Sequence, residues 1–335
     1  MCLACGRSYP VLLDRVPVLV DEPLAHVART LASLERLIGE HRGKVEHLDM
    51  LLARGTERDE ALALLRTALI ENARFLLARR AELVGLVPQD APQPQVVSPR
   101  PDPSLGYLVD VFDFVRQDWS TTEDCREDVE TIIATLRAGI RARVPAPRRA
   151  AFLGAGLARF ASDLRGEVEQ LIALDVSLMM ALSHLALHDG EVRLFEINER
   201  IAYDLAGLAR PITASAKSSA PIDYCVADAR QMPFADASLD LVVSAFFTDV
   251  VPLSALLREV RRVLAPGGAF IHFGPLGYHF YMPEEMWTVE EARQVFARHG
   301  FELQDEAWVP VWLQRSSARM SNTRVDAWSF VAVVR

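Results

Sequence analysis

The sequence has few cysteines, no long apolar run and no excess of basic residues. Four cysteines in 335 residues are too few for a disulfide scaffold and are typical of reduced thiols. No apolar run reaches the roughly 18 residues that a membrane-spanning helix needs, and no basic-then-apolar leader opens the chain. A formal net charge of −9 argues against a wide phosphate-binding surface. These absences predict a cytoplasmic protein that binds neither nucleic acid nor membrane.

The length of 335 residues predicts about two domains, and half of the residues are hydrophobic, which is ample for a packed core. The pattern divides the chain into four parts. Residues 1–22 contain two short apolar runs and predict a β-ribbon, and residues 23–87 predict a helical hairpin. Residues 88–103, PQDAPQPQVVSPRPDP, form a proline-rich linker. Residues 104–335 are predicted to form an α/β domain.

The predicted helical hairpin consists of two amphipathic helices, 23–55 and 57–87, joined by a break at Gly55. Thr56 can cap the second helix together with Asp59, three residues further on. Such a hairpin can serve as a homodimer interface, a lid over a substrate site or simple packing against a larger domain. Packing is the favoured interpretation. Deletion of residues 1–103 separates an enzyme from a partner-binding protein that works through the ribbon and hairpin, because an enzyme core should still bind its cofactor.

Residues 149–177 predict a strand, a glycine turn, a helix, a second strand and an acidic residue. A short apolar run leads directly into Gly154 and Gly156, whose backbone can turn sharply and approach a ligand. A second apolar run, 171–174, ends at Asp175. A carboxylate placed there, roughly 20 residues after a glycine turn, can accept hydrogen bonds from ribose hydroxyls. The stretch predicts a nucleoside ligand, although NAD, FAD and purely structural turns share the glycine pattern.

The rest of the chain continues the alternation of strands and helices. Apolar runs typical of buried strands recur at 222–227, 238–245 and 269–273, with helical spacing between the last two. Two further strand-like runs end the chain, whereas residues 211–219, rich in Ala and Ser, predict a loop. The order predicts a mostly parallel sheet with an antiparallel C-terminal edge.

Two motifs after the predicted third strand resemble class I S-adenosylmethionine-dependent methyltransferases. Residues 226–234, VADARQMPF, and 238–242, SLDLV, are similar to that superfamily's D-A-x-x-L-P-F and S-F-D-x-V segments. Residues 261–268, RRVLAPGG, are similar to its R-V-L-K-P-G-G turn. The resemblance implies a Rossmann-like fold with a seven-stranded, mostly parallel sheet, and S-adenosylmethionine as the cofactor.

The same resemblance assigns roles to the residues at the sheet edge. Gly154, Gly156 and Asp175 would bind the cofactor through the glycine turn and the ribose. The Asp228 carboxylate can accept from the 6-amino group of adenine, and the backbone N–H of Ala229 can donate to the ring. No metal site is implied for this domain.

A narrower resemblance connects residues 114–335 with the family that includes carnosine N-methyltransferases. Its motifs C-F-F-I-D-T, N-L-G-P-L-L-Y-H-F and F-V-R-D-W-S are matched by FFTD, HFGPLGYHF and FVRQDWS, which lie at 246–249, 272–280 and 114–120. In that family the positions of Asp249 and His279 belong to the substrate site.

These positions suggest a chemistry for the acceptor. Asp249 would hold one N–H of an imidazole acceptor, and His279 would orient the substrate or take a proton. The resemblance implies a small-molecule or histidine-containing peptide substrate. The alternative for Asp249 is to cap the helix that starts near Pro252. Arg116, in a predicted break between two helices at 105–115 and 123–140, is predicted to line the pocket mouth and bind the cofactor.

The chain departs from this family in several places. The region before the last strand has no tyrosine cluster, the insert between the second and third strands is shorter, and Ala158 replaces a glycine. These departures leave carnosine itself in doubt as the substrate. An O-methyltransferase that acts on a hydroxyl or carboxylate, and a non-catalytic protein that binds S-adenosylmethionine or a partner, remain open.

The first residues of the chain resemble half of a short zinc ribbon. Cys2 and Cys5, followed by Gly-Arg and a Tyr-Pro-Val run, are similar to the small zinc-ribbon activators of methyltransferases. Zinc prefers four ligands, and only this one Cys-x-x-Cys pair is present. Either the metal site has been lost or another chain completes it.

Overall fold

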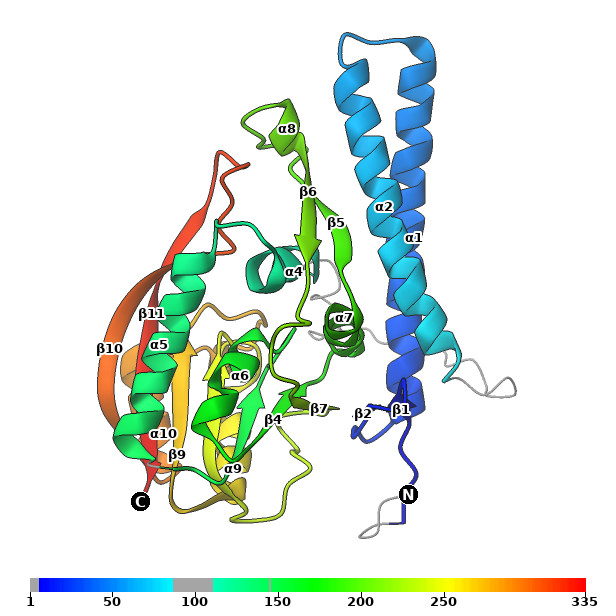
Figure 1. Cartoon of the computed structure of the whole chain (residues 1–335). Coiled ribbons are helices and arrows are strands. Elements are labelled where there is room, and N and C mark those ends of the chain that lie inside the picture. Colours follow the sequence, from blue (N-terminus) through cyan, green and yellow to red (C-terminus); the bar gives the residue numbers. More distant parts are fainter. Residues whose placement is uncertain (1–5, 87–110, 145) are drawn as a thin grey trace.

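The computed structural model describes residues 6–86, 111–144 and 146–335 (Figure 1). Cys2, Cys5 and the predicted proline-rich linker, 88–103, therefore lie outside the described residues. In the described part of the chain, every helix is too short or too polar to span a bilayer.

A seven-stranded sheet lies at the centre of the molecule, in the order β10-β11-β9-β8-β3-β4-β7. In chain order its strands are β3 (Arg149–Leu153), β4 (Gln170–Asp175), β7 (Asp223–Val226), β8 (Leu239–Ala245), β9 (Leu264–Gly274), β10 (Phe301–Leu313) and β11 (Thr323–Val334). Five neighbouring strands of the sheet, β9, β8, β3, β4 and β7, are parallel to one another. The strand β11 runs antiparallel to both β9 and β10. The predicted α/β fold and its antiparallel edge are confirmed.

Helices cover both faces of this sheet. They are α4 (Val111–Trp119), α5 (Arg126–Arg143), α6 (Arg159–Leu164), α7 (Leu178–Asp189), α9 (Leu253–Val263) and α10 (Val289–Arg298). The short helix α8 (Leu205–Leu208) lies away from this sheet (Figure 1), and two 3₁₀ turns are η1 (Arg165–Glu167) and η2 (Pro283–Glu285). Successive residues of β3 point to opposite faces, so Phe152 belongs to one apolar cluster and Leu153 to another. The first cluster contains α5, α6 and α7, and the second contains α9 and α10.

The strand order sets the place of the ligand. The strand β3 lies between β4 and β8, so the chain leaves β3 toward one side of the sheet and returns on the other. Open α/β sheets bind ligands outside the carboxyl ends of the strands at such a switch point. The glycine turn leaves the sheet at this place.

A short ribbon precedes the sheet. The strands β1 (Val11–Leu12) and β2 (Val16–Pro17) pair antiparallel, as predicted. Val18 then pairs in parallel with Val226 of β7, and the Leu19 N–H donates to the Val226 carbonyl oxygen at 2.7 Å. The ribbon therefore continues into the β7 edge of the central sheet.

The helical hairpin consists of α1 (Pro23–Arg54) and α2 (Asp59–Val84), joined at a turn where Thr56 donates to Asp59 (Figure 1). Its apolar stripe is buried inside the chain. Val27, Leu34 and Leu76 belong to the same apolar cluster as Phe152 of the sheet. Burying one such side chain stabilises a fold by about 1.5–3 kcal/mol, so a chain without the hairpin would expose much of its core. The hairpin is thus part of the folded unit.

One segment that predicted a loop is a strand. Residues 211–219 overlap β6 (Ala209–Ala214), which pairs with β5 (Val192–Ile197) in a separate antiparallel hairpin. Tertiary contacts explain the difference. The Asn72 side chain of α2 donates to the Phe195 carbonyl oxygen and accepts from the Phe195 N–H, each at 2.8 Å. The strand pair is held by a helix distant in sequence, so local composition did not reveal it.

Candidate active site

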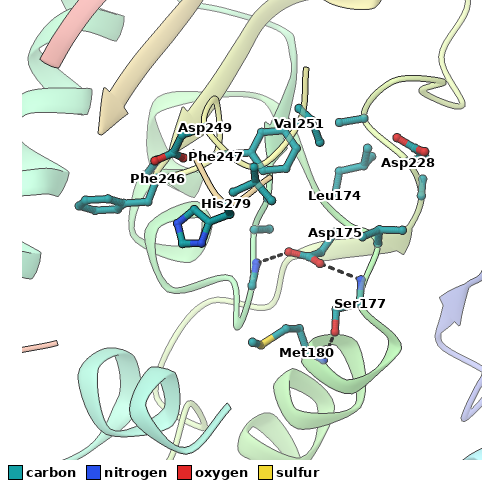
Figure 2. Close-up of a pocket in the computed structure, with 18 of the residues that line it drawn as sticks. Leu174, Asp175, Ser177, Met180, Asp228, Phe246, Phe247, Asp249, Val251 and His279 are labelled. Atoms are coloured by element: carbon teal, nitrogen blue, oxygen red, sulfur yellow. Dashed lines mark hydrogen bonds between the residues drawn. The ribbon is translucent and has the colours of Figure 1, made fainter. Parts of the chain in front are cut away.

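A cavity of about 1150 Å³ opens at the carboxyl ends of the parallel strands (Figure 2). It is lined by the glycine turn after β3, the ends of β4 and β8, the loop after β7 and the segment after β9. Among the predicted site residues, Gly154, Gly156, Asp175, Asp228, Ala229, Asp249 and His279 all line it. Seven of the predicted positions, scattered over 126 residues of sequence from 154 to 279, therefore meet in one space.

The glycine turn depends on glycine at its first position. Gly154 has φ of +60°, and a Cβ added to it would lie 2.3 Å from the Phe247 ring. Gly156 has φ of +52°, but a Cβ added there would meet nothing within 4 Å. Gly154 is therefore required by both conformation and close packing. Gly156 is required by conformation only, and leaves room beside its backbone.

Asp175 ends β4 with both carboxylate oxygens facing backbone donors. Its Oδ2 accepts from the Gly156 N–H at 2.8 Å, and its Oδ1 accepts from the Ser177 N–H at 2.8 Å (Figure 2). Burial raises the pKa of Asp175, and these two N–H groups oppose the rise. The carboxylate is thus held rigidly at the edge of the cavity, and each oxygen keeps a lone pair that a ribose hydroxyl can use.

Asp228 lies at the same edge but already has a cationic partner. Arg230 contacts it with its backbone N–H at 2.8 Å and with its guanidinium at 2.6 Å. An adenine amino group would share this carboxylate with Arg230. Next to it, Ala229 is buried, and in the described part of the chain its backbone N–H finds no acceptor. That free donor is what a ring nitrogen requires.

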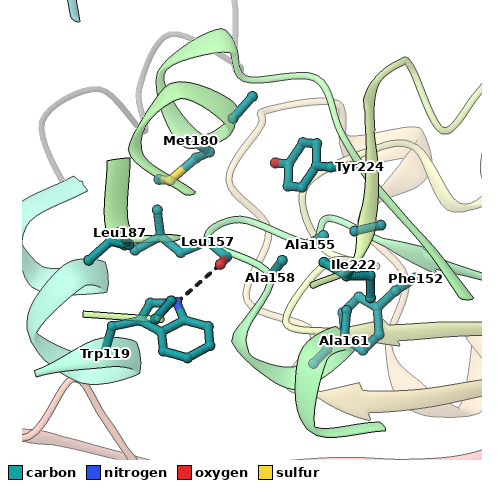
Figure 3. Packing of buried hydrophobic residues seen from close by; sticks show 14 of the residues in the cluster. Trp119, Phe152, Ala155, Leu157, Ala158, Ala161, Met180, Leu187, Ile222 and Tyr224 are labelled. Atoms are coloured by element: carbon teal, nitrogen blue, oxygen red, sulfur yellow. Dashed lines mark hydrogen bonds between the residues drawn. The ribbon is translucent and has the colours of Figure 1, made fainter. Parts of the chain in front are cut away.

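Arg116 is placed differently from the prediction. Residues 116–119 continue α4 instead of breaking it, and the helix turns Arg116 into the interior, where it is 1% exposed. Its guanidinium donates to the carbonyl oxygens of Gln314 and Arg315 at 2.5 and 2.6 Å. Arg116 does not line the cavity and instead connects α4 to the loop after β10. Trp119, at the end of α4, is buried and donates to the Leu157 carbonyl oxygen at 3.1 Å (Figure 3).

Asp118 is a cavity residue that sequence reasoning did not select. It is 5% exposed, and its carboxylate accepts from the Gln117 amide at 3.1 Å. Burial raises its pKa to about 7, while the nearby Arg159 opposes the rise. Arg159 also donates to the Asp118 backbone carbonyl oxygen at 2.6 Å, which places Asp118 beside the glycine turn. A buried acid at that position can accept from an ammonium group.

Asp249 lies beyond the end of β8 and is 3% exposed. Its Oδ2 accepts from the Gly277 N–H at 3.0 Å, and its backbone carbonyl accepts from the His279 N–H at 3.0 Å. Its Oδ1 is buried and has no hydrogen-bond partner. Burial raises the pKa of Asp249, and the Gly277 N–H and His279 oppose the rise. The carboxylate does not cap α9, where no side-chain cap is present, so it is available to a ligand.

The turn that carries Asp249 is strained. Phe246 has φ of +51°, which is costly for an aromatic residue. Gly274, where β9 ends, lies so close that a Cβ there would approach the Phe246 backbone to 3.0 Å. Figure 2 shows Phe246, Phe247, Asp249 and His279 grouped on one side of the cavity, apart from Asp175.

His272 supports this turn from below and was not selected from the sequence. It is fully buried, with Nδ1 3.1 Å from the Ser244 hydroxyl and Nε2 3.2 Å from the Gly274 carbonyl oxygen. Nε2 therefore donates and Nδ1 accepts. Burial lowers the pKa of His272 to about 3, so the ring is neutral. Thr248, next to Asp249, lies 3.3 Å from Nε2. The only sequence signal was a polar residue inside an apolar strand.

These residues are suited to S-adenosylmethionine. Gly156 leaves a cradle beside its backbone, Asp175 offers lone pairs for a ribose, and Ala229 offers a free N–H for a base. Asp118 adds a buried carboxyl group to the wall of the same cavity. In the described part of the chain, no group of three or more His, Cys, Asp or Glu side chains is arranged to hold a metal ion.

Comparison with known proteins identifies a methyltransferase domain in this part of the chain. A family model described as "Methyltransferase domain" matches residues 152–272, which contain the glycine turn, Asp175, Asp228 and Asp249. Residues 152–272 thus match a methyltransferase domain. The matched span begins in β3 and ends within β9, so it includes the ends of β3, β4, β7 and β8 but not the segment after β9 that carries His279.

Curated relatives of the methyltransferase domain are partial matches. The chain is 32% identical over 119 residues to the ubiquinone/menaquinone biosynthesis C-methyltransferase UbiE of Pseudomonas fluorescens, covering 34% of this chain and 45% of that protein. It is 42% identical over 57 residues to the UbiE protein of Rubrivivax gelatinosus, and this match covers 17% of this chain and 23% of that protein. The chain thus spans less than half of the length of these relatives.

Among solved structures, the magnesium protoporphyrin IX methyltransferase of Synechocystis PCC 6803, solved with bound S-adenosylmethionine, is 14% identical to the chain. Its TM-score is 0.43, and the match covers 71% of this chain and all of that one.

Proposed function

We propose that this chain transfers a methyl group from S-adenosylmethionine to a nitrogen of a small molecule or peptide, with an imidazole ring as the favoured acceptor. The observation that carries the proposal is the Oδ1 atom of Asp249, which is buried beside the cavity and has no hydrogen-bond partner. A buried carboxylate oxygen without a partner is costly. An N–H donor on the acceptor would remove that cost.

An imidazole suits this position because its two nitrogens have different roles. The ring N–H donates to Asp249, and the other nitrogen keeps its lone pair for the methyl group. The carboxylate then stabilises the positive charge that develops on the ring. A carboxylate acceptor would instead bring a second negative charge toward Asp249, which disfavours it.

The cofactor, when bound, supplies a methyl group that is already activated on its sulfonium. The remaining tasks belong to the chain: to align the acceptor and exclude water. The Gly277 N–H fixes the orientation of Asp249 through Oδ2, and the raised pKa of Asp249 lets it take the ring proton as the methylated product forms. His279 lies beside it, at the cavity, and orients the acceptor.

The test is methyl transfer with the full-length protein and methyl-labelled S-adenosylmethionine. The acceptor panel holds histidine, histidine-containing dipeptides, other imidazoles, hydroxyl compounds, carboxylates and a quinol. We expect label on an imidazole nitrogen. We also expect Asp249→Asn to lower kcat by about 100-fold or more, with unchanged affinity for adenosylhomocysteine.

Asp223→Asn is the matched control, because Asp223 is exposed at the start of β7 and lies away from the cavity. It should behave like the wild-type protein. An active Asp249→Asn variant would contradict the proposed role of Asp249. Label found only on a hydroxyl, a carboxylate or a quinol carbon would replace the imidazole with that acceptor.

A further inference from the structure

The amino-terminal segment 19–29 contributes part of the cavity wall, although it lies more than a hundred residues before the methyltransferase domain. It consists of the end of the ribbon and the first turns of α1. Six of its residues line the cavity: Leu19, Val20, Asp21, Glu22, His26 and Arg29. The segment therefore lines the same cavity as the residues that are predicted to bind the cofactor.

Two anchors hold this segment against the loops that carry the nucleoside-binding carboxylates. The Leu19 N–H donates to the carbonyl oxygen of Val226, two residues before Asp228, at 2.7 Å. The His26 Nε2 lies 2.7 Å from the carbonyl oxygen of Val176, the residue directly after Asp175. Because a carbonyl oxygen only accepts, Nε2 is the donor. Each anchor joins the segment to one carboxylate-bearing strand end.

The chemistry of the segment complements that of the carboxylates. Asp175 and Asp228 can reach hydroxyl and amino groups at the edges of a nucleoside. Leu19 and Val20 are half-buried apolar side chains, and Leu19 packs against the cluster that contains Ala227 and Ala229. Ligand sites combine such apolar walls with a few placed polar groups.

We propose that segment 19–29 is part of the cofactor site and covers its nucleoside end. The inference rests on the proposed function, in that it assumes an adenosine moiety held by Asp175 and Asp228. The nucleoside then lies between the two carboxylate-bearing loops and the chain's own amino-terminal segment. The helical hairpin, which begins within this segment, supports the wall by packing into the main core.

The test compares two ligands that share the nucleoside. Calorimetry on the full-length protein measures the affinity for adenosylhomocysteine and for adenosine in Leu19→Ala and His26→Ala. Because the segment contacts only the shared nucleoside, each variant should weaken both ligands by the same factor, about 3–10-fold. The matched controls are Leu24→Ala and His47→Ala, which replace exposed residues of α1 that do not line the cavity. Both controls should keep wild-type affinities.

Wild-type affinity in a folded Leu19→Ala and a folded His26→Ala would overturn the inference. A loss for adenosylhomocysteine without a loss for adenosine would also overturn it, because the segment would then act at the amino-acid end. If His26→Ala does not fold, Leu19→Ala alone decides. Absence of any adenosylhomocysteine binding by the wild-type protein is a different failure, since it would refute the proposed function itself.

Discussion

The two ends of the cavity differ in the groups that line them: mainly backbone groups at one end and mainly side chains at the other. At the proposed cofactor end, most of the available groups belong to the backbone: the positive-φ turn at Gly154, the amides that hold Asp175, and the free N–H of Ala229. At the acceptor end, side chains from three separated segments meet, and Asp249 keeps a buried oxygen without a partner. The group left for a ligand is a backbone N–H donor at Ala229 and a side-chain carboxylate acceptor at Asp249.

This difference indicates which end of the cavity determines the specificity for the methyl acceptor. A site made of backbone amides and a glycine turn accepts one common cofactor and tolerates little change in the turn. A site made of side chains on a strained turn, supported by a buried neutral histidine, can change its acceptor by substitution of a few residues. The comparison predicts large effects on folding and cofactor binding at one end, and effects on turnover at the other.

The largest expected effect is at the glycine turn. Gly154→Ala should lower the free energy of unfolding by about 2–4 kcal/mol, because the new methyl group clashes with Phe247 and the turn adopts a left-handed conformation. Gly156→Ala is the matched control, with a similar φ but no neighbour within 4 Å, and should cost only about 1–2 kcal/mol. Urea denaturation measures both. Equal losses would show that the close approach of Phe247 has no energetic weight.

Next in size is the loss of the ribose carboxylate. Asp175→Asn should weaken adenosylhomocysteine binding by about 30–100-fold, because an amide nitrogen would face one of the two backbone N–H groups that now bind the carboxylate. Asp228→Asn should weaken it less, by about 3–10-fold, since Arg230 already shares that carboxylate. Calorimetry gives both affinities. A larger effect at Asp228 would reverse this ranking of the two residues.

At the acceptor end, His272→Gln should reduce turnover at saturating cofactor and leave adenosylhomocysteine affinity unchanged. Its stability effect should depend on pH. The folded pKa of about 3 lies below the ordinary value of 6.5, so the unfolded chain takes up a proton that the folded chain refuses, and His272 costs the wild type stability as pH falls below about 6.5. That loss is at most about 1.4 kcal/mol per pH unit.

The deficit of His272→Gln relative to wild type should therefore shrink between pH 7 and pH 5. Denaturation curves for both proteins at the two pH values measure it. A deficit that stays constant would mean that His272 is protonated in the folded protein. A turnover equal to wild type would remove its positioning role beneath Asp249.

The smallest effect is expected at Asp118, beside the glycine turn. With its pKa raised to about 7, the wild-type protein should bind adenosylhomocysteine about 3–10-fold more tightly at pH 8 than at pH 6, because only the ionised carboxylate attracts an ammonium group. Asp118→Asn should bind with the weaker affinity at both pH values. Asp128→Asn, on the α5 wall of the cavity, should keep the wild-type pH dependence. A flat wild-type profile would exclude Asp118 from ligand binding.

The cofactor end could be predicted from the sequence because its signals are local. A glycine turn between two apolar runs, and an acid at the end of each following strand, are adjacent in the chain and need no knowledge of distant contacts. The alternation of apolar runs also predicted the sheet and its antiparallel edge. The helix hairpin was found by its apolar stripes and by the pairing of Thr56 with Asp59.

Other features had no local signal. Arg116 was misplaced because α4 continues four residues beyond the predicted helix end at 115, which turns the side chain into the interior. The β5–β6 hairpin depends on Asn72, and the support of Asp249 depends on His272, Ser244 and Gly274 from neighbouring strands. The cavity wall at segment 19–29 depends on contacts with β7 and the loop after β4, across about 150 residues or more.

The sequence by itself determined the fold class and the positions of the acids at the sheet edge, because apolar periodicity and glycine spacing act over a few residues. The methyl-donor chemistry was implied by the resemblance of short motifs to a known family. Only the tertiary structure decided which side chains are buried together. It made Asp249 an unsatisfied acceptor and His272 a neutral support, and it brought the amino-terminal segment into the cavity wall. Burial and the distance between polar atoms are properties of segments brought together in space, and they set both the pKa of a group and the partners it has left.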